Sequence, residues 1–152
     1  MSYQPNRPTI RPIEPADEAR WRELFRAYRE FYKLPASEVV VDRVWTWLND
    51  PSHETHGLVA VLGTAVSGIA HYRKFARPST GTTGLWLDDL FTDPDARGQG
   101  LGRALIDQLT QNARENDLSV VRWITADDNH PAQKLYDSIA RTTNWVTYDA
   151  TL

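Results

Sequence analysis

The sequence predicts a mixed α/β (α+β) domain, and two observations lead to that prediction. The apolar pattern alternates between strand-like and helix-like periods, in the order strand, two helices, three strands, helix, strand, helix, strand. The three consecutive strands suit antiparallel pairing, whereas the strand–helix–strand unit over residues 85–125 requires a parallel pair with a right-handed crossover. We expect one domain over residues 1–152.

In the first half of the chain, turn residues separate the periodic segments. Pro15 suits the first turn of a helix, Ser37 is the expected N-cap of a second helix, and Gly63 marks a hairpin. The elements expected here are a flexible tail at 1–8, a strand at 9–14, helices at 15–32 and 37–48, and strands at 58–62 and 66–74.

In the second half, a glycine cluster and a loop rich in Pro, Ser, Thr and Gly set the boundaries. Strand 85–92 ends at Asp93-Pro94, and the next helix begins near Gly100. The elements expected here are a loop at 77–84, that strand and helix, a strand at 119–125, a short helix at 131–140 and a final strand at 144–152.

Composition excludes several classes of protein. The net charge of −3 argues against a nucleic-acid partner, and no apolar run is long enough for a membrane span. The chain has no cysteine, which excludes disulfides, cysteine-ligated zinc and a catalytic cysteine. His53 and His56 lack a spacing that suggests a metal site, so no metal is expected. With no apolar leader at its N-terminus, the protein is expected in the cytoplasm.

The segment from Arg97 to Arg103 is the strongest functional signal. It joins a strand to a helix, where unpaired backbone N–H groups and the helix dipole favour a phosphate. Its three glycines alternate along the chain and let the backbone approach an anion, and the two arginines add charge-assisted hydrogen bonds. A Walker A loop is excluded because no lysine follows, and the dinucleotide fingerprint expects glycine where Arg103 stands.

These residues carry a resemblance to the Gcn5-related N-acetyltransferases (GNAT). Arg97, Gly100 and Gly102 match the family motif Gln/Arg-x-x-Gly-x-Gly/Ala, and residues 129–136 resemble its Asn-x-x-Ala-x-x-Leu-Tyr helix. A narrower resemblance is to a subgroup that includes yeast enzymes acetylating histones, polyamines and D-amino acids. It rests on Leu87-Asp88-Asp89-Leu90-Phe91, on Trp123 and on Leu135-Tyr136-Asp137.

The resemblance implies a mostly antiparallel sheet with a central splayed parallel pair, about four helices, and acetyl-coenzyme A (acetyl-CoA) as co-substrate. Pantetheine would lie between the splayed strands, and a backbone N–H near Phe91 or Thr92 would polarise the thioester. The residues implied for cofactor binding are Leu90, Phe91, Thr92, Arg97, Gly98, Gln99, Gly100, Leu101, Gly102, Arg103, Asn129, Ala132 and Tyr136.

The resemblance also implies catalytic roles. Tyr136 matches the tyrosine that protonates the departing thiolate, and Asp88 and Asp89 stand where the family often has an acidic residue. Strand alternation predicts that only one of the two carboxylates faces the cleft, and we favour Asp88 as the base or substrate-orienting group. His71 and Tyr72 lie on a strand that borders the acceptor site in the family, but we expect them to be structural.

The predicted function is therefore acetyl transfer to a primary amine by direct attack in a ternary complex, with a small cationic amine or amino acid as acceptor. A protein lysine or N-terminus, and a non-catalytic acyl-CoA-binding regulator, remain as alternatives. The second family motif departs from its pattern, since Ala140 replaces glycine and only one strand follows. An unpaired final strand favours pairing with another chain, so we expect a homodimer or higher homo-oligomer.

Overall fold

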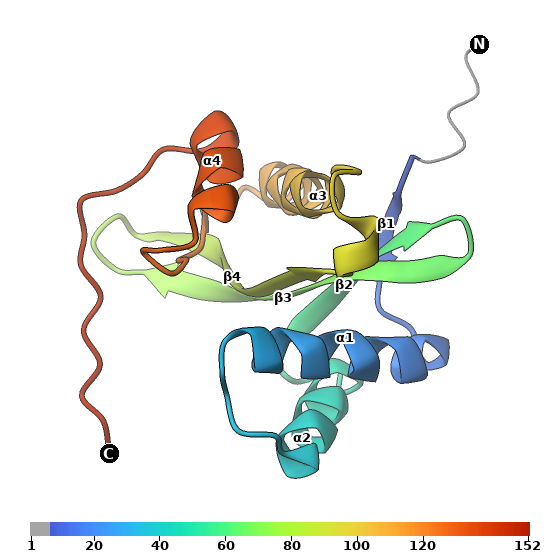
Figure 1. The fold of residues 1–152 in the computed structure, drawn as a ribbon. Coiled ribbons are helices and arrows are strands. Elements are labelled where there is room, and N and C mark those ends of the chain that lie inside the picture. The colour runs from blue at the N-terminus through green and yellow to red at the C-terminus, as the bar shows by residue number, and fades with distance from the viewer. Residues whose placement is uncertain (1–6) are drawn as a thin grey trace.

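The sheet has the strand order β1-β2-β3-β4-β5 and separates two pairs of helices, α1 and α2 on one face and α3 and α4 on the other (Figure 1). A computed structural model describes residues 7–152. Its elements are β1 (Thr9–Pro12), α1 (Glu18–Phe31), α2 (Glu38–Leu48), β2 (His56–Leu62), β3 (Ala65–Arg77), β4 (Thr82–Thr92), α3 (Leu101–Glu115), β5 (Val121–Arg122), α4 (His130–Ile139) and two 3-10 turns, Pro15–Asp17 and Pro94–Ala96.

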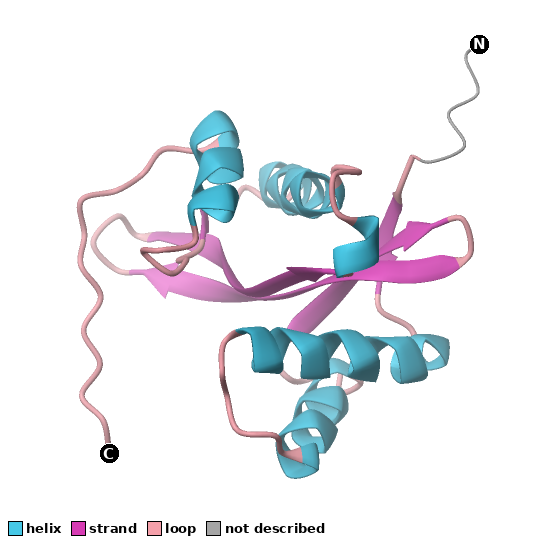
Figure 2. Ribbon diagram, in the orientation of Figure 1, coloured by secondary structure: helices cyan, strands magenta, loops and turns pink. Residues whose placement is uncertain are grey.

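The pairing confirms the predicted fold class. Strands β1 to β4 pair antiparallel in sequence order, whereas β4 and β5 are parallel and are joined through α3. The connection from β1 to β2 runs through α1 and α2 on one face of the sheet, and the connection from β4 to β5 runs through α3 on the other face (Figure 2). The one parallel pair lies at the β5 edge of the sheet and not at its centre as predicted, because residues 144–152 form no strand that could pair with β5.

Local sequence explains where the elements begin. The Ser37 side chain accepts a hydrogen bond from the N–H of Val40 at 3.3 Å and so caps α2. Gly63 has a φ of +61°, which suits the tight β2–β3 turn. None of the helices within residues 7–152 is long and apolar enough to cross a membrane.

Apolar side chains fill both faces of the sheet. On the α1 and α2 face, Trp21 is fully buried and stacks on Phe25 at 5.0 Å and on Trp45 at 5.2 Å. On the α3 face, Leu105 and Leu109 are fully buried against the sheet. The sheet is thus the middle layer of a three-layer domain, with a separate cluster on each side.

The structure corrects several predicted boundaries. The strand expected at 144–152 is absent: these residues are exposed and have no regular structure, because no neighbouring strand offers a hydrogen-bonded ladder. The strand expected at 119–125 pairs only at Val121–Arg122. The loop expected at 77–84 is shorter, because β3 and β4 extend their antiparallel ladder to Arg77 and Thr82. Most of the tail expected at 1–8, residues 1–6, lies outside the described residues.

A homodimer remains a prediction, now on a different basis. Residues 141–152 extend away from the body of the protein (Figure 1), and in this tail Trp145 is 83% exposed and Tyr148 is 89% exposed. Large aromatic side chains left in water favour burial against another surface. We expect a dimeric mass in light-scattering chromatography at micromolar concentration, and a shift toward monomer in a Trp145→Ser, Tyr148→Ser double variant. A monomeric mass for the parent chain would contradict this expectation.

A buried ion pair connects β1 to the turn before α1, and it makes a stability prediction. Asp17 is 5% exposed, and its carboxylate accepts two hydrogen bonds from Arg11, at 2.8 and 2.9 Å, and one from the N–H of Glu14 at 2.8 Å. We expect Asp17→Asn to lower the free energy of unfolding by about 3 kcal/mol at pH 7, because the change leaves Arg11 with only the exposed carboxylate of Glu14, 3.7 Å away, as its anion. Asp42→Asn, which removes an exposed carboxylate from Arg22, is the matched control and should have a much smaller effect.

The sign of the pH dependence follows from the same contacts. Hydrogen bonds from Arg11 hold the pKa of Asp17 below its usual value. The stabilisation is therefore fully present above the unfolded pKa of about 4 and is lost as the pH falls through the folded value. Chemical denaturation across this range should show the two proteins converging in stability at low pH, and a constant difference would contradict the assignment.

Candidate functional site

Strands β4 and β5 pair only at Leu85–Val121 and Trp86–Arg122 and then diverge. Beyond Trp86, β4 remains paired with β3 on its other side, but it has no ladder partner toward β5. A cavity of about 560 Å³ lies along this unpaired part of β4. Its walls are Phe31, Tyr32, Leu90, Phe91, Thr92, Ala96, Arg97, Gly98, Gly100, Leu101, Gly102, Arg103, Asn129, Pro131, Ala132, Leu135 and Tyr136.

The N-terminus of α3 lines this cavity and carries no side-chain cap. Gly100 is the N-cap residue, with a φ of +74°, and Gly98 has a φ of +81°. A Cβ atom at either glycine would meet nothing within 4 Å, so the space in front of the helix is open. The first-turn amides and the guanidinium groups of Arg97 and Arg103 are therefore available to an anion such as a pyrophosphate.

The loop that leads to this helix is fixed at Asp93. Its N–H donates to the carbonyl of Ser67 at 2.8 Å, and its carboxylate accepts from the N–H of Asp95 at 2.9 Å. Arg20 of α1 forms an ion pair with the same carboxylate. These contacts, the Asp95 N–H first, hold the pKa of Asp93 below its usual value. They connect α1 and β3 to the start of the glycine segment.

Helix α4 closes the opposite side of the cavity and contributes Tyr136. The Asn129 side chain caps α4 by accepting a hydrogen bond from the N–H of Ala132 at 3.4 Å. The Tyr136 ring packs edge-on against Trp123, with ring centroids 5.4 Å apart. Burial, and to a lesser extent Tyr32, raises the pKa of Tyr136, so its hydroxyl keeps its proton and can donate it.

Asp88 and Asp89 lie on the same face of the sheet, which corrects the strand alternation on which the prediction that only one faces the cleft was based. A β-bulge causes this: His71 pairs with Asp89 and the next residue of β3, Tyr72, pairs with Leu87, so Asp88 is an extra residue on β4. Asp89 hydrogen-bonds to His71, and Asp88 to Arg73 at 3.1 Å. His71 and Arg73 are two residues apart on β3, and His71 packs against α1.

The two carboxylates have different environments. Burial raises the pKa of Asp88 and outweighs the opposing effect of Arg73. Burial also acts on Asp89, but the hydrogen bond and electrostatic interaction with His71, with a smaller contribution from the Tyr28 hydroxyl, outweigh it, so the pKa of Asp89 lies below its usual value. One carboxylate is thereby suited to taking a proton and the other to remaining an anion.

The sheet, the cavity and its residues agree with the comparisons with known proteins. A model of the acetyltransferase (GNAT) family matches residues 21–139. The chain belongs to this family. It is 32% identical to the D-amino-acid N-acetyltransferase HPA3 of Saccharomyces cerevisiae, over 94% of this chain and 90% of that protein.

One further relative is similar in sequence, and one solved structure is similar in fold. The thialysine N-epsilon-acetyltransferase of Caenorhabditis elegans is 28% identical over 78% of this chain and 76% of its own length. The ribosomal-protein-alanine N-acetyltransferase of Brucella melitensis has the same fold, with a TM-score of 0.83 and 23% identity over 96% of this chain and all of that one.

The cavity of this GNAT protein gathers nearly all of the residues predicted to bind the cofactor. Among them, only Gln99 does not line it. Sequence reasoning missed Phe31 and Tyr32 at the end of α1, although the aromatic stripe of that helix was the available signal. Asp88 and Asp89 lie outside the cavity lining, but their neighbour Tyr28 connects them to it, since its ring is 4.9 Å from that of Tyr32.

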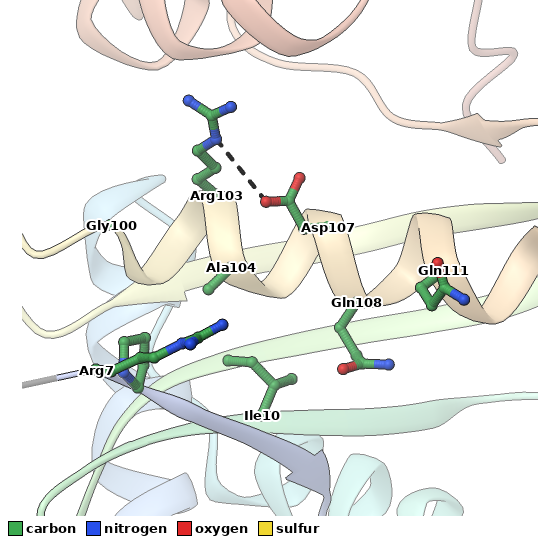
Figure 3. A pocket seen from close by; sticks show the side chains of 9 residues that line it. Arg7, Ile10, Gly100, Arg103, Ala104, Asp107, Gln108 and Gln111 are labelled. Atoms are coloured by element: carbon green, nitrogen blue, oxygen red, sulfur yellow. Dashed lines mark ion pairs between the residues drawn. The ribbon is translucent and has the colours of Figure 1, made fainter. Parts of the chain in front are cut away.

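A second hollow of about 400 Å³ lies beside α3. Gly100 and Arg103 line both hollows, and Arg7, Ile10 and Gln108 line only this one. Arg7 lies under α3, while Arg103 points to the other side and forms an ion pair with Asp107 (Figure 3). The guanidinium group of Arg7 is therefore a third one near the start of α3, in addition to those of Arg97 and Arg103.

The anion site can be tested at Gly100. We expect Gly100→Asp to weaken CoA binding at least about 30-fold in calorimetry, because the carboxylate places a negative charge where the helix dipole favours a phosphate. Gly81→Asp is the matched control, since Gly81 also has a positive φ, +64°, and open space around it, but lies in the β3–β4 turn. Both variants should lose similar thermal stability. Equal CoA binding by the two would contradict the anion site.

Proposed function

We propose that this protein transfers the acetyl group of acetyl-CoA to a primary amine by direct attack in a ternary complex. The observation that carries the proposal is the meeting, in one cavity, of the uncapped α3 N-terminus and the hydroxyl of Tyr136. The first suits a pyrophosphate and the second suits proton donation to a leaving thiolate.

The proposed residues for acetyl-CoA follow from the walls of the cavity. The amides of the first turn of α3, with Arg97 and Arg103, would hold the pyrophosphate. The unpaired edge of β4 at Leu90–Thr92 and the side chain of Asn129 would hold pantetheine in the gap beside β5. When bound, acetyl-CoA supplies the activated acetyl thioester.

The acceptor amine would approach from the α1 face. Asp88 and Asp89 place two carboxylates there, and Tyr28 and Tyr32 add aromatic rings, a combination that attracts a cation. The names of two relatives, a D-amino-acid and a thialysine acetyltransferase, agree with a small acceptor that carries an ammonium group. We therefore favour a small cationic amine or an amino acid over a protein amine.

Two residues of the protein are assigned proton transfers. Asp88 accepts the proton that the acceptor ammonium must lose before it can attack, so an N–H bond breaks and an O–H bond forms. As the N–C bond forms and the C–S bond breaks, Tyr136 donates its hydroxyl proton to the departing sulfur. The second N–H bond of the nitrogen then breaks, its proton replaces the one that Tyr136 gave up, and the proton on Asp88 passes to water. Asp89 remains an anion and orients the ammonium group. The raised pKa of Asp88 suits a base, because a carboxylate with a higher pKa accepts a proton more readily than an ordinary aspartate does.

The experiment that tests the function is thiol release from acetyl-CoA in the presence of an amine panel, with CoA binding measured in parallel. The panel should contain polyamines, D- and L-amino acids, aminoglycosides and a histone tail peptide. We expect turnover with small amines or amino acids. Turnover with the peptide alone would favour the protein-amine alternative, binding without turnover would favour an acyl-CoA-binding regulator, and no binding would contradict the proposal.

The role of Tyr136 makes a separate prediction. We expect Tyr136→Phe to lower kcat by about 100-fold, because the variant loses the proton donor but keeps the ring that packs against Trp123. The KM for acetyl-CoA should change only slightly. Tyr148→Phe, in the exposed tail, is the matched control. A variant that retains full kcat would show that Tyr136 is not the general acid.

A further inference from the structure

A chain of hydrogen bonds runs from the core of the α1 face to Asp89. The indole N–H of Trp21 donates to Nε2 of His71 at 2.9 Å, and Nδ1 of His71 lies 2.8 Å from Oδ2 of Asp89. His71 is 2% exposed and Trp21 is fully buried, whereas the Asp89 side chain is 26% exposed. This series of hydrogen bonds therefore begins in the interior and ends at a carboxylate that a small molecule can reach.

The donor at Trp21 determines where His71 carries its proton. An indole nitrogen can only donate a hydrogen bond, so Nε2 of His71 must be the acceptor and carry no proton. A neutral imidazole then has its single proton on Nδ1, and this proton points at Asp89. An imidazolium would direct two N–H groups at each other across the 2.9 Å contact with Trp21. The surroundings thus favour the neutral Nδ1–H tautomer.

The same environment holds Asp89 from a second side. The Tyr28 hydroxyl of α1 interacts with this carboxylate, and burial, reinforced by Asp89, raises the pKa of Tyr28, so the hydroxyl stays protonated. The ionisable groups that face His71 and Asp89 are thus Tyr28 from α1, Asp88 from β4 and Arg73 from β3. Phe25, also from α1, packs edge-on against the imidazole at 5.2 Å.

We propose that His71 is a positioning residue for amine acetylation: fixed by Trp21, its Nδ1–H holds Asp89 as an oriented carboxylate that binds the ammonium group of the acceptor. The inference rests on the proposed function and extends it, because it assigns a role to a core histidine that does not line the cavity. A purely apolar side chain at position 71 would fill the same space, but it would leave the Trp21 N–H and one Asp89 oxygen without partners.

The tautomer can be tested directly by NMR on the full chain with ¹⁵N-labelled histidine. Long-range ¹H–¹⁵N correlations distinguish the Nδ1–H tautomer, the Nε2–H tautomer and the imidazolium. The chain has four histidines, and His71→Asn identifies the signals of His71 by their loss. We expect the Nδ1–H pattern in the parent protein at about pH 7. Trp21→Phe should introduce the imidazolium, because Nε2 is then free to take a proton while Nδ1–H still faces Asp89, whereas Trp45→Phe, which removes a neighbouring indole that does not bond to His71, should not.

Kinetics test the consequence for catalysis. We expect His71→Phe to lower kcat/KM for the amine about 30-fold, within the range that outer-shell partners of catalytic groups commonly contribute, with the KM for acetyl-CoA little changed. His71→Asn restores an N–H donor near the position of Nδ1 and should remain within about fivefold of the parent. Trp21→Phe should fall between the two.

The outcomes separate this inference from the proposed function. An imidazolium or an Nε2–H pattern in the parent protein would overturn the inference. So would parent-like kcat/KM in His71→Phe, or equal losses in the Asn and Phe variants, because the loss would then not depend on the donor to Asp89. If His71→Phe does not fold, the NMR pattern and the Asn variant still decide. A parent protein without turnover of any amine would instead overturn the proposed function.

Discussion

The cavity depends on how little of β4 pairs with β5. Two residue pairs hold the parallel strands together, and every later residue of β4 is held only by β3. One side of β4 is therefore paired with β3 along its length except at the Asp88 bulge, while the other edge keeps free backbone groups for a ligand. Because α3 starts directly after this edge, its uncapped N-terminus opens into the same space. The separation of the strands thus brings a backbone edge and a helix dipole to one ligand.

A second constraint, the bulge at Asp88, determines the electrostatics of the proposed acceptor side. A regular strand would place Asp88 and Asp89 on opposite faces, one of them against α3. The extra residue turns both toward α1, where Arg73 and His71 provide different partners. Two adjacent carboxylates would raise each other's pKa if they shared a single environment. Their separate partners allow one to remain ionised beside the other, which is what an acceptor site for a cation requires.

The sequence predicted the features that depend on local interactions and not those that depend on contacts between residues far apart in the chain. The order of elements and the walls of the cavity were predictable, because periodicity and the segment from Arg97 to Arg103 are local signals. The bulge was not, since the register between β3 and β4 depends on contacts far apart in the chain. The hydrogen bond between Trp21 and His71 was not predictable for the same reason, because the two residues are 50 positions apart in the chain. The prediction of a strand at 144–152 was wrong, because β-branched and aromatic residues favour a strand only where a neighbouring strand is present.

The connection between α1 and the proposed acceptor site explains why the hydrogen-bonded series Trp21–His71–Asp89 lies in an otherwise apolar cluster. Burying an imidazole and an indole N–H costs free energy unless each polar atom finds a partner, and here both nitrogens of His71 are satisfied. An apolar cluster would hold α1 against the sheet equally well, since Phe25 and Val41 already do so. What it would lack is a fixed direction for Asp89, because a carboxylate at the edge of a sheet rotates freely without a donor. The hydrogen bonds therefore contribute orientation at the site more than stability of the fold.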